Sequence, residues 1–333
     1  MGAASGWVRD MWDERVDGLP RIPVGDWIDN AFDWVKDNLD AFFDEVADLL
    51  RDAVTGIADL LNSPAPLVLA FVFALLALAV RDWKVAAGTL VGMALIISMD
   101  QWENAMDTLA LIVVATFVAL VIAIPLGILA ARSDRFSRVI RPIMDLMQTM
   151  PAFVWLVPVV TLFSIGVPAG LVATIIFALP PGVRLTELGI RQVDAEVVEA
   201  GHAFGATPRQ ILREVQLPLA LPTVMAGVNQ VIMLALSMAV IAGLVGGGGL
   251  GSEVTSSISR LDIGLGFEAG ISVVILAIFL DRVTASAGQR GPRRGLLRGL
   301  RARVSRPARP KSAGRADTTA AATEQQNVPA GTG

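Results

Sequence analysis

The sequence VEAGHAFGATPRQILREVQLP, residues Val198–Pro218, is a polar, helix-forming stretch between two long apolar segments. The residues that lead into it, Asp194–Ala203, are good helix formers. Gly205 adopts at no steric cost the left-handed conformation that ends a helix. The sequence therefore predicts a short helix followed by a sharp break. We call Val198–Pro218 the knuckle and expect it at a membrane face, because it is too charged to lie in lipid.

A second short helix is predicted after the break. Thr207 is a good N-cap residue, Pro208 fits a first helical turn, and Gln210 stands at the third position of a capping box. Pro218 and Pro222 follow, and we expect them to stop this helix because proline lacks the backbone N–H that a helix needs.

The composition indicates a polytopic, all-α membrane protein. Hydrophobic residues make up 54% of the 333 residues, and the mean hydropathy is +0.61. The apolar residues are clustered into long runs, as spans require. The chain has no cysteine, which excludes disulfides and thiolate metal sites. The first thirty residues lack the apolar core of a signal peptide, so we expect the internal helices to direct insertion.

About seven spans are predicted. The first two apolar runs are short for a span, so a re-entrant hairpin is the alternative there. The basic loop Arg132–Arg141, the knuckle and the basic C-terminal segment are placed in the cytoplasm by the positive-inside rule, with the N-terminus outside. The expected spans are Pro66–Val80, Val85–Met99, Asp107–Ala131, Met144–Gly166, Val167–Pro181, Pro222–Val245 and Glu268–Leu280.

Four regions are expected along the chain. Residues 1–63 form an acidic segment whose core, Asp26–Leu61, has the periodicity of an amphipathic helix. Anionic lipid would repel its acidic face, which favours packing on another helix or subunit over lying on the bilayer. Residues 64–104 hold two accessory helices and residues 105–285 a transmembrane domain. Residues 286–333 are a basic tail, rich in Ala, Gly and Pro, that we expect to be disordered.

The knuckle resembles the EAA loop of ABC importer permeases in the spacing of Glu-Ala-Gly, Gly205 and the Val-x-Leu-Pro ending. It departs at Gly201, where the family usually has alanine, and at Val215, where it usually has isoleucine. With QTMPAFVWLVPVV (Gln148–Val160) and IIFALPPGVRLTELGIRQV (Ile175–Val193), the chain resembles the permeases of glycine betaine/proline betaine importers over about residues 105–285.

This resemblance implies a type I ABC importer transmembrane domain that imports a quaternary ammonium osmoprotectant. It implies a permease homodimer with two copies of an ABC ATPase subunit, an extracytoplasmic substrate-binding protein and the lipid bilayer as partners, and no nucleic acid. In the family this loop docks in a groove of the ATPase. The residues that would couple ATPase closure to the spans are Glu199, Ala200, Gly201, Gly205, Leu217 and Pro218.

The chain itself is predicted not to be an enzyme. It has no phosphate loop, because none of its lysines follows a Gly-x-x-x-x-Gly pattern. The apolar stretches from Thr108 to Leu280 carry almost no ionisable groups, which ion-coupled carriers usually place there. An ion-coupled carrier or channel is therefore the weaker alternative. We expect no cofactor and no metal.

Other candidate sites are less specific. Asn229 and Gln230, which are polar within an apolar span, line the path or form interhelical hydrogen bonds. The glycine run Gly246, Gly247, Gly248 and Gly249 is either a flexible outer gate or a tight turn. No aromatic cage for a quaternary ammonium is visible, and there is no tyrosine. A permease needs no such cage if a separate binding protein selects the ligand. Another small solute, such as choline, carnitine or an amino acid, is the alternative substrate.

Overall fold

The computed structural model describes residues 15–16, 19–20 and 24–288, and most of the predicted basic tail lies outside the described residues. Apart from one antiparallel pair of two-residue strands, β1 (Arg15–Val16) and β2 (Leu19–Pro20), the regular structure described is helical. The helices are α2 (Val24–Asn62), α3 (Pro66–Val80), α4 (Trp83–Ser98), α5 (Trp102–Arg132), α6 (Asp134–Thr149), α7 (Ala152–Phe163), α8 (Val167–Arg191), α9 (Ala195–Ala203), α10 (Pro208–Gln210), the π-helix η1 (Ile211–Gln216), α11 (Leu217–Ala242), the 3₁₀-helix η2 (Gly243–Val245), α12 (Gly249–Arg260) and α13 (Ile263–Gly288).

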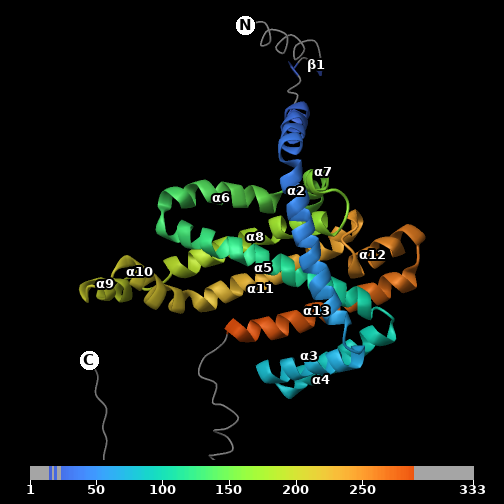
Figure 1. Cartoon of the computed structure of the whole chain (residues 1–333). Coiled ribbons are helices and arrows are strands. Elements are labelled where there is room, and N and C mark those ends of the chain that lie inside the picture. Colours follow the sequence, from blue (N-terminus) through green and yellow to red (C-terminus); the bar gives the residue numbers. More distant parts are fainter. Residues whose placement is uncertain (1–14, 17–18, 21–23, 289–333) are drawn as a thin grey trace, which may run out of the picture. The chain divides into compact units, whose positions relative to one another are not determined.

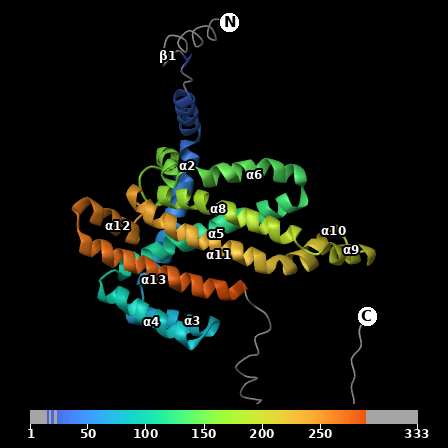
Figure 2. The same ribbon diagram turned by 180° about the vertical axis from the view of Figure 1, so that it is seen from behind.

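Helices α5, α8 and α11 form the centre of the protein and run side by side (Figures 1 and 2). Their shared core is rich in alanine, which lets the backbones approach closely, as in membrane helix pairs. A Cβ atom on Gly182 of α8 would lie 2.8 Å from the Ala123 Cβ of α5. A Cβ atom on Gly127 of α5 would lie 2.5 Å from the Thr186 Cβ. Glycine is therefore required at both points of contact.

Helices α3 and α4 form an antiparallel hairpin that packs beside α13 (Figure 1). Phe73 and Phe279 hold the hairpin to α13, with ring centroids 5.1 Å apart. The observed bounds of α3 equal the predicted ones, and those of α4 differ by one or two residues. With 15 and 16 residues, each helix is shorter than the roughly 20 residues that a perpendicular span needs.

The predicted span Met144–Gly166 is divided in the structure. Helices α6 and α7 meet at an angle of 101°. Met150, at the break, has an extended conformation (φ −71°, ψ 136°) because the ring of Pro151 disfavours helical backbone in the residue before it. The α6 half is amphipathic, and only α7 is continuously apolar.

By length and composition, four of the described helices are able to cross a membrane, or up to six if each bent pair counts as one span. The count of about seven predicted from the sequence included α3 and α4 as separate spans. Helix α8 also continues to Arg191, beyond the expected end at Pro181. Its packing on α5 and α11 maintains the helix through Pro180 and Pro181, although each proline removes a donor.

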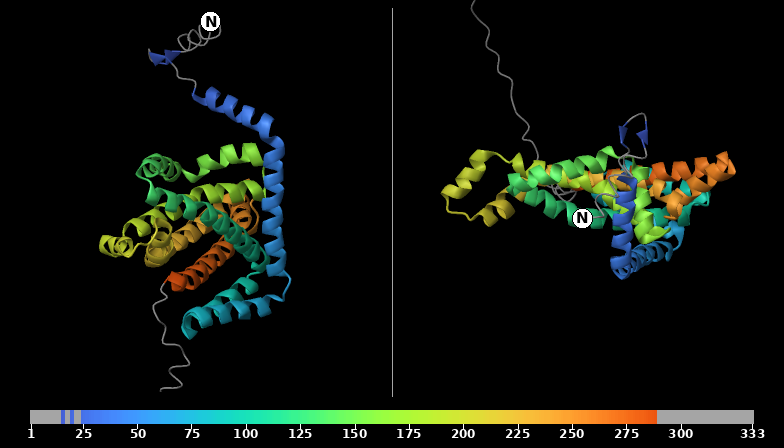
Figure 3. Two further views of the ribbon diagram at one scale, coloured as in Figure 1. Left: turned by 60° about the vertical axis from the view of Figure 1, so that its left-hand side comes forward. Right: turned by 90° about the horizontal axis from the view of Figure 1, so that it is seen from above.

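Helix α2 crosses the other helices instead of running along them, as Figure 3 shows, and it meets α3 at 99°. Val54 and Ala58, in its C-terminal half, are buried in the core shared by α5, α8 and α11. Asn62, at its end, donates a hydrogen bond of 3.3 Å to Asp107 of α5. Its N-terminal half leaves large apolar side chains exposed, including Trp34 and Phe42. The amphipathic helix predicted from the sequence thus packs on the protein over only part of its length.

Candidate functional site

The knuckle begins with helix α9, which is closed at both ends by local hydrogen bonds. At its start the carboxylate of Asp194 accepts from the backbone N–H of Glu196 at 2.9 Å. At its end Gly205 N–H donates to the carbonyl of His202 at 2.9 Å, and Ala206 N–H donates to that of Gly201 at 3.0 Å. This pair is a Schellman motif, and Gly205 has the left-handed φ of +80° that the motif requires. The predicted break is confirmed.

The second half of the knuckle starts with the predicted capping box. Gln210 N–H donates to Thr207 Oγ1 at 3.4 Å, and Thr207 N–H donates to Gln210 Oε1 at 2.9 Å. Pro208 occupies the first turn. These contacts fix the angle between the two short helices by means of residues within the knuckle itself.

The expectation that Pro218 and Pro222 end this helix is wrong. The chain stays helical from Pro208 to Val245, a length of 38 residues. Residues Ile211–Gln216 form a π-helix, in which Leu217 N–H donates to the carbonyl of Leu212, five residues back. The wider turn precedes Pro218 directly and accommodates its ring and its missing N–H. The knuckle is therefore rigidly continuous with α11.

The surface of the knuckle is open. No residue of α9 is buried, and the side chain of Phe204 is 93% exposed. Ile211 and Leu212 are buried and hold the knuckle to the rest of the protein. A Cβ atom on Gly201 would lie 3.4 Å from Ile211 Cγ1, so alanine fits there with a small adjustment. A Cβ atom on Gly205 would meet nothing within 4 Å.

A buried carboxylate stands at the base of the knuckle. Glu187 of α8 has a side chain that is only 4% exposed. Its Oε1 accepts from Ser137 Oγ at 2.7 Å and from Arg141 at 2.8 Å, both on α6. Arg191, one turn later on α8, lies 2.9 Å from the same oxygen. These contacts compensate the desolvation of the carboxylate, because each is a hydrogen bond or an opposite charge.

The cluster extends from Glu187 to three helices. Arg191 forms an ion pair of 2.7 Å with Asp134 at the start of α6 and donates to the carbonyl of Ala130, near the end of α5, at 2.8 Å. Arg184 and Asp145 form a further ion pair between α8 and α6. Beside them lies a cavity of about 330 Å³. The cluster therefore joins α5, α6 and α8 where α8 leads into the knuckle.

The sequence analysis did not find this cluster. The available signal was an acid at the end of an apolar run, flanked by Arg184 and Arg191 at helical spacing. Its partners on α6 lie 46 and 50 residues away in the sequence, and no local pattern connects them.

Asn229 and Gln230 have different surroundings. Asn229 donates to Asp281 at 3.2 Å and accepts from Thr284 Oγ1 at 2.7 Å, so it bridges α11 and α13. Gln230 is exposed, and its side chain makes no hydrogen bond to another described residue. Asn229 therefore forms the interhelical hydrogen bonds that were one of the two alternatives predicted for it.

The glycine run is a closely packed turn at the opposite end of α11 from the knuckle. Gly247 N–H donates to the carbonyl of Ala242 at 2.9 Å. A Cβ atom on Gly249 would lie 2.4 Å from Thr108 Oγ1, the atom that accepts from Leu250 N–H at 2.8 Å. Gly246, Gly248 and Gly249 all have positive φ. This geometry favours the tight turn, and the outer gate stays a prediction.

The profile of one family, described as binding-protein-dependent transport system inner membrane component, matches residues 123–290. The chain belongs to this family. It is thus a multi-pass membrane protein and a permease subunit of the ABC importer class, as the sequence predicted. In this class the ATPase is a separate subunit.

Three relatives resemble this permease over most of its length. The glycine betaine transport system permease protein OpuAB of Bacillus subtilis is 47% identical, over 84% of this chain and 99% of its own. The glycine betaine/proline betaine transport system permease protein ProW of Escherichia coli is 48% identical, over 86% of this chain and 82% of its own. The glycine betaine/carnitine transport permease protein GbuB of Listeria monocytogenes is 44% identical, over 80% of this chain and 95% of its own.

Replacing Glu187 by glutamine tests the cluster at the base of the knuckle. We expect Glu187→Gln to lower the free energy of unfolding by about 1–3 kcal/mol, because hydrogen bonds to a charged group are lost from a buried site. Thermal unfolding of the purified permease measures this effect. The control is Asp48→Asn, which removes the exposed Arg51–Asp48 pair and is expected to cost at most about 1 kcal/mol. Equal effects of the two changes would contradict the structural role of Glu187.

Proposed function

We propose that this permease imports glycine betaine, proline betaine or a related quaternary ammonium solute, with energy from ATP hydrolysed by a partner. The observation that carries the proposal is the 47–48% identity to relatives named for these solutes over at least 84% of the chain. The exposed knuckle supports it, because a permease without a phosphate loop needs a surface on which an ATPase acts.

The proposed assembly is a homodimer of the permease with two ATPase subunits and one extracytoplasmic binding protein that selects the solute. A separate binding protein accounts for the lack of an evident aromatic cage in this chain. Phe163, a half-buried aromatic residue at the end of α7, packs edge-on against Phe43 of α2, with ring centroids 5.3 Å apart. Its ring therefore packs between helices and is not part of a ligand cage. We also propose the organisation given above, with the transport unit in residues 105–285, an acidic segment in 1–63, accessory helices in 64–104 and a basic tail from 286.

The knuckle end of the helices is proposed to face the cytoplasm. The start of α6, the end of α8, the end of α13 and the α3–α4 turn lie toward this end (Figures 1 and 2). Arginine and lysine residues gather there, including Lys84, Arg135, Arg209 and Arg282. Positive charge flanking the spans favours the cytoplasmic side. Helix α2 and the glycine run would then lie toward the outside.

Coupling is proposed to run from the knuckle along two rigid routes. One route is the unbroken helix from Pro208 into α11, whose π-helix keeps the chain hydrogen-bonded across Pro218. The other is α8, which leads into α9 and is tied to α6 by the Glu187–Arg141 and Arg191–Asp134 ion pairs. When ATP closes the ATPase subunits, the knuckles move with them and turn α8 and α11 together. The proposed coupling residues are the six named above, from Glu199 to Pro218.

Reconstitution tests the proposed function. The permease, its ATPase and the binding protein are inserted into or added to lipid vesicles, and uptake of labelled glycine betaine is measured with and without ATP. We expect uphill uptake only when all three proteins and ATP are present. Uptake by the permease alone would instead favour an ion-coupled carrier. Uptake of carnitine or choline but not of glycine betaine would retain the ABC mechanism and reassign the solute.

The change Gly205→Asp tests the coupling role of the knuckle. The new side chain enters open space in this chain and aspartate tolerates the left-handed conformation, so insertion and folding are expected to be kept. We expect loss of ATP-driven uptake, because the side chain occupies the surface that fits the ATPase. The matched control is Gly56→Asp in α2, which also meets nothing within 4 Å. Normal uptake by the Gly205→Asp permease would count against the coupling role.

Asn229 and Gln230 are proposed to have separate effects on transport. We expect Gln230→Ala to lower the rate of uptake with little change in thermal stability, because its free amide is available to the path. Asn229→Ala should instead lower the unfolding temperature, because it leaves Asp281 and Thr284 without their partner on α11. Uptake assays and thermal unfolding of both variants distinguish the two roles. Unchanged uptake by Gln230→Ala would remove this residue from the proposed path.

A further inference from the structure

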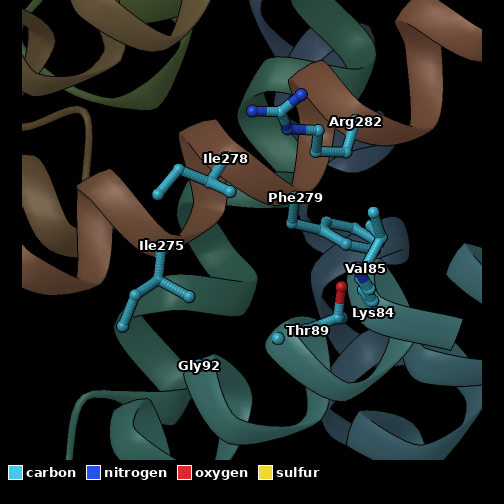
Figure 4. A pocket seen from close by; sticks show the side chains of 9 residues that line it. Lys84, Val85, Thr89, Gly92, Ile275, Ile278, Phe279 and Arg282 are labelled. Atoms are coloured by element: carbon cyan, nitrogen blue, oxygen red, sulfur yellow. The ribbon is translucent and has the colours of Figure 1, made fainter. Parts of the chain in front are cut away.

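A groove of about 420 Å³ lies between α4 and α13, away from the knuckle and the Glu187 cluster. Figure 4 shows that its wall is mostly apolar, with Phe279, Ile275 and Ile278 on the α13 side. The α4 side contributes Gly88, which leaves room where a larger side chain would fill the groove, and Gly92, at which α4 and α13 approach closely. A Cβ atom on Gly88 would meet nothing within 4 Å.

Two cations lie toward the same end of this groove. Gly92 of α4 faces Ile275 of α13, because a Cβ atom on Gly92 would lie 2.7 Å from Ile275 Cγ2. From this contact Lys84 lies eight residues back along α4, and Arg282 lies seven residues forward along α13. Since the two helices are antiparallel, both side chains reach the same end of the groove, and both line it.

These cations have no acidic partner among the residues that the structure describes. The nearest acid on α13, Asp281, is turned toward α11, where it accepts from Asn229 at 3.2 Å. Thr89, which also lines the groove, has a hydroxyl that makes no hydrogen bond to another described residue. The groove thus combines an apolar floor with two uncompensated positive charges and a free hydroxyl at one end.

We infer that this groove binds an anionic phospholipid, with one acyl chain along Gly88, Ile278 and Phe279 and the phosphate at Lys84 and Arg282. The groove lies between two apolar helices of a membrane protein, so we expect it to be in contact with lipid. Basic pockets between membrane helices are a known form of headgroup site. A soluble anion would gain nothing from the apolar wall, and a zwitterionic lipid would gain little from the two cations.

Such a lipid would hold the α3–α4 hairpin to the transport unit. The hairpin contacts α13 through Phe73 and Phe279, and α13 is tied in turn to α11 through Asn229. A phosphate between Lys84 and Arg282 would add a charged link between α4 and α13, beside the apolar contact that Phe279 makes. This inference concerns lipid binding by the permease chain itself and does not depend on which solute is transported.

Native mass spectrometry of the full-length permease tests the site. The protein in detergent is titrated with phosphatidylglycerol and, separately, with phosphatidylcholine that carries the same acyl chains. We expect tighter binding of the first phosphatidylglycerol. The affinity should fall roughly fivefold for Lys84→Gln or Arg282→Gln and further for the double variant, because each basic group near a headgroup contributes about that factor. Gly88→Leu should reduce binding of this lipid by filling the groove.

The controls separate the site from general effects. Arg81→Gln removes a cation from the same turn outside the groove, and Gly270→Leu adds bulk to α13 at another surface, so both should bind as the unchanged protein does. Lys84→Arg should restore binding, and thermal unfolding shows that each variant is folded. The inference is overturned if the double variant keeps its preference for phosphatidylglycerol, if folded Gly88→Leu binds normally, or if glycerol phosphate displaces the lipid.

Discussion

The carboxylate of Glu187 is the point at which polar contacts from α5, α6 and α8 meet, at the base of the knuckle. A carboxylate that is 4% exposed is stable only when hydrogen bonds and opposite charges replace its water. Ser137 and Arg141 supply them from α6, and Arg191 supplies them from α8 and reaches α5 as well. Because the partners come from different helices, the carboxylate adds a polar link between them to the apolar packing of the core. The amphipathic α6 is held against α8 by these contacts and by the apolar packing of its buried Met144 on Leu179 and Val183.

The central helices obey a second constraint, which is the need to keep backbone groups paired inside a membrane. Proline removes a donor wherever it occurs, yet α8 contains Pro180 and Pro181 and the helix leading into α11 contains Pro218. In α8 the close contacts with α5 and α11, made possible by Gly127 and Gly182, hold the helix together. Before Pro218 the π-helix changes the hydrogen-bond pattern itself. The close helix contacts in α8 and the π-helix before Pro218 thus keep both helices continuous between the knuckle and the core.

Local features were predictable from the sequence, and distant ones were not. The break at Gly205 and the capping box of Thr207 depend on residues within four or five positions, so the pattern alone identifies them. The bounds of α3 were predictable for the same reason. The bend at Pro151 had its signal in the proline, but the apolar run on both sides favoured one span. The Glu187 cluster could not be found from local patterns, because its members meet only after α6 folds back over α8. The surroundings of Asn229 depend likewise on α13, more than 50 residues away.

The π-helix at Ile211–Gln216 also affects how sequences of this family are compared. A turn with i→i+5 hydrogen bonds holds about one residue more than an α-helical turn. A helical wheel drawn through Pro208–Ala242 with a single period therefore rotates one half of the helix by roughly 100° against its true orientation. A relative that lacks one residue at this point would present an otherwise identical knuckle surface, rotated about the axis of α11. A single-residue gap in an alignment at this point therefore changes the rotation of one half of the helix about its axis, and not only the length of the helix.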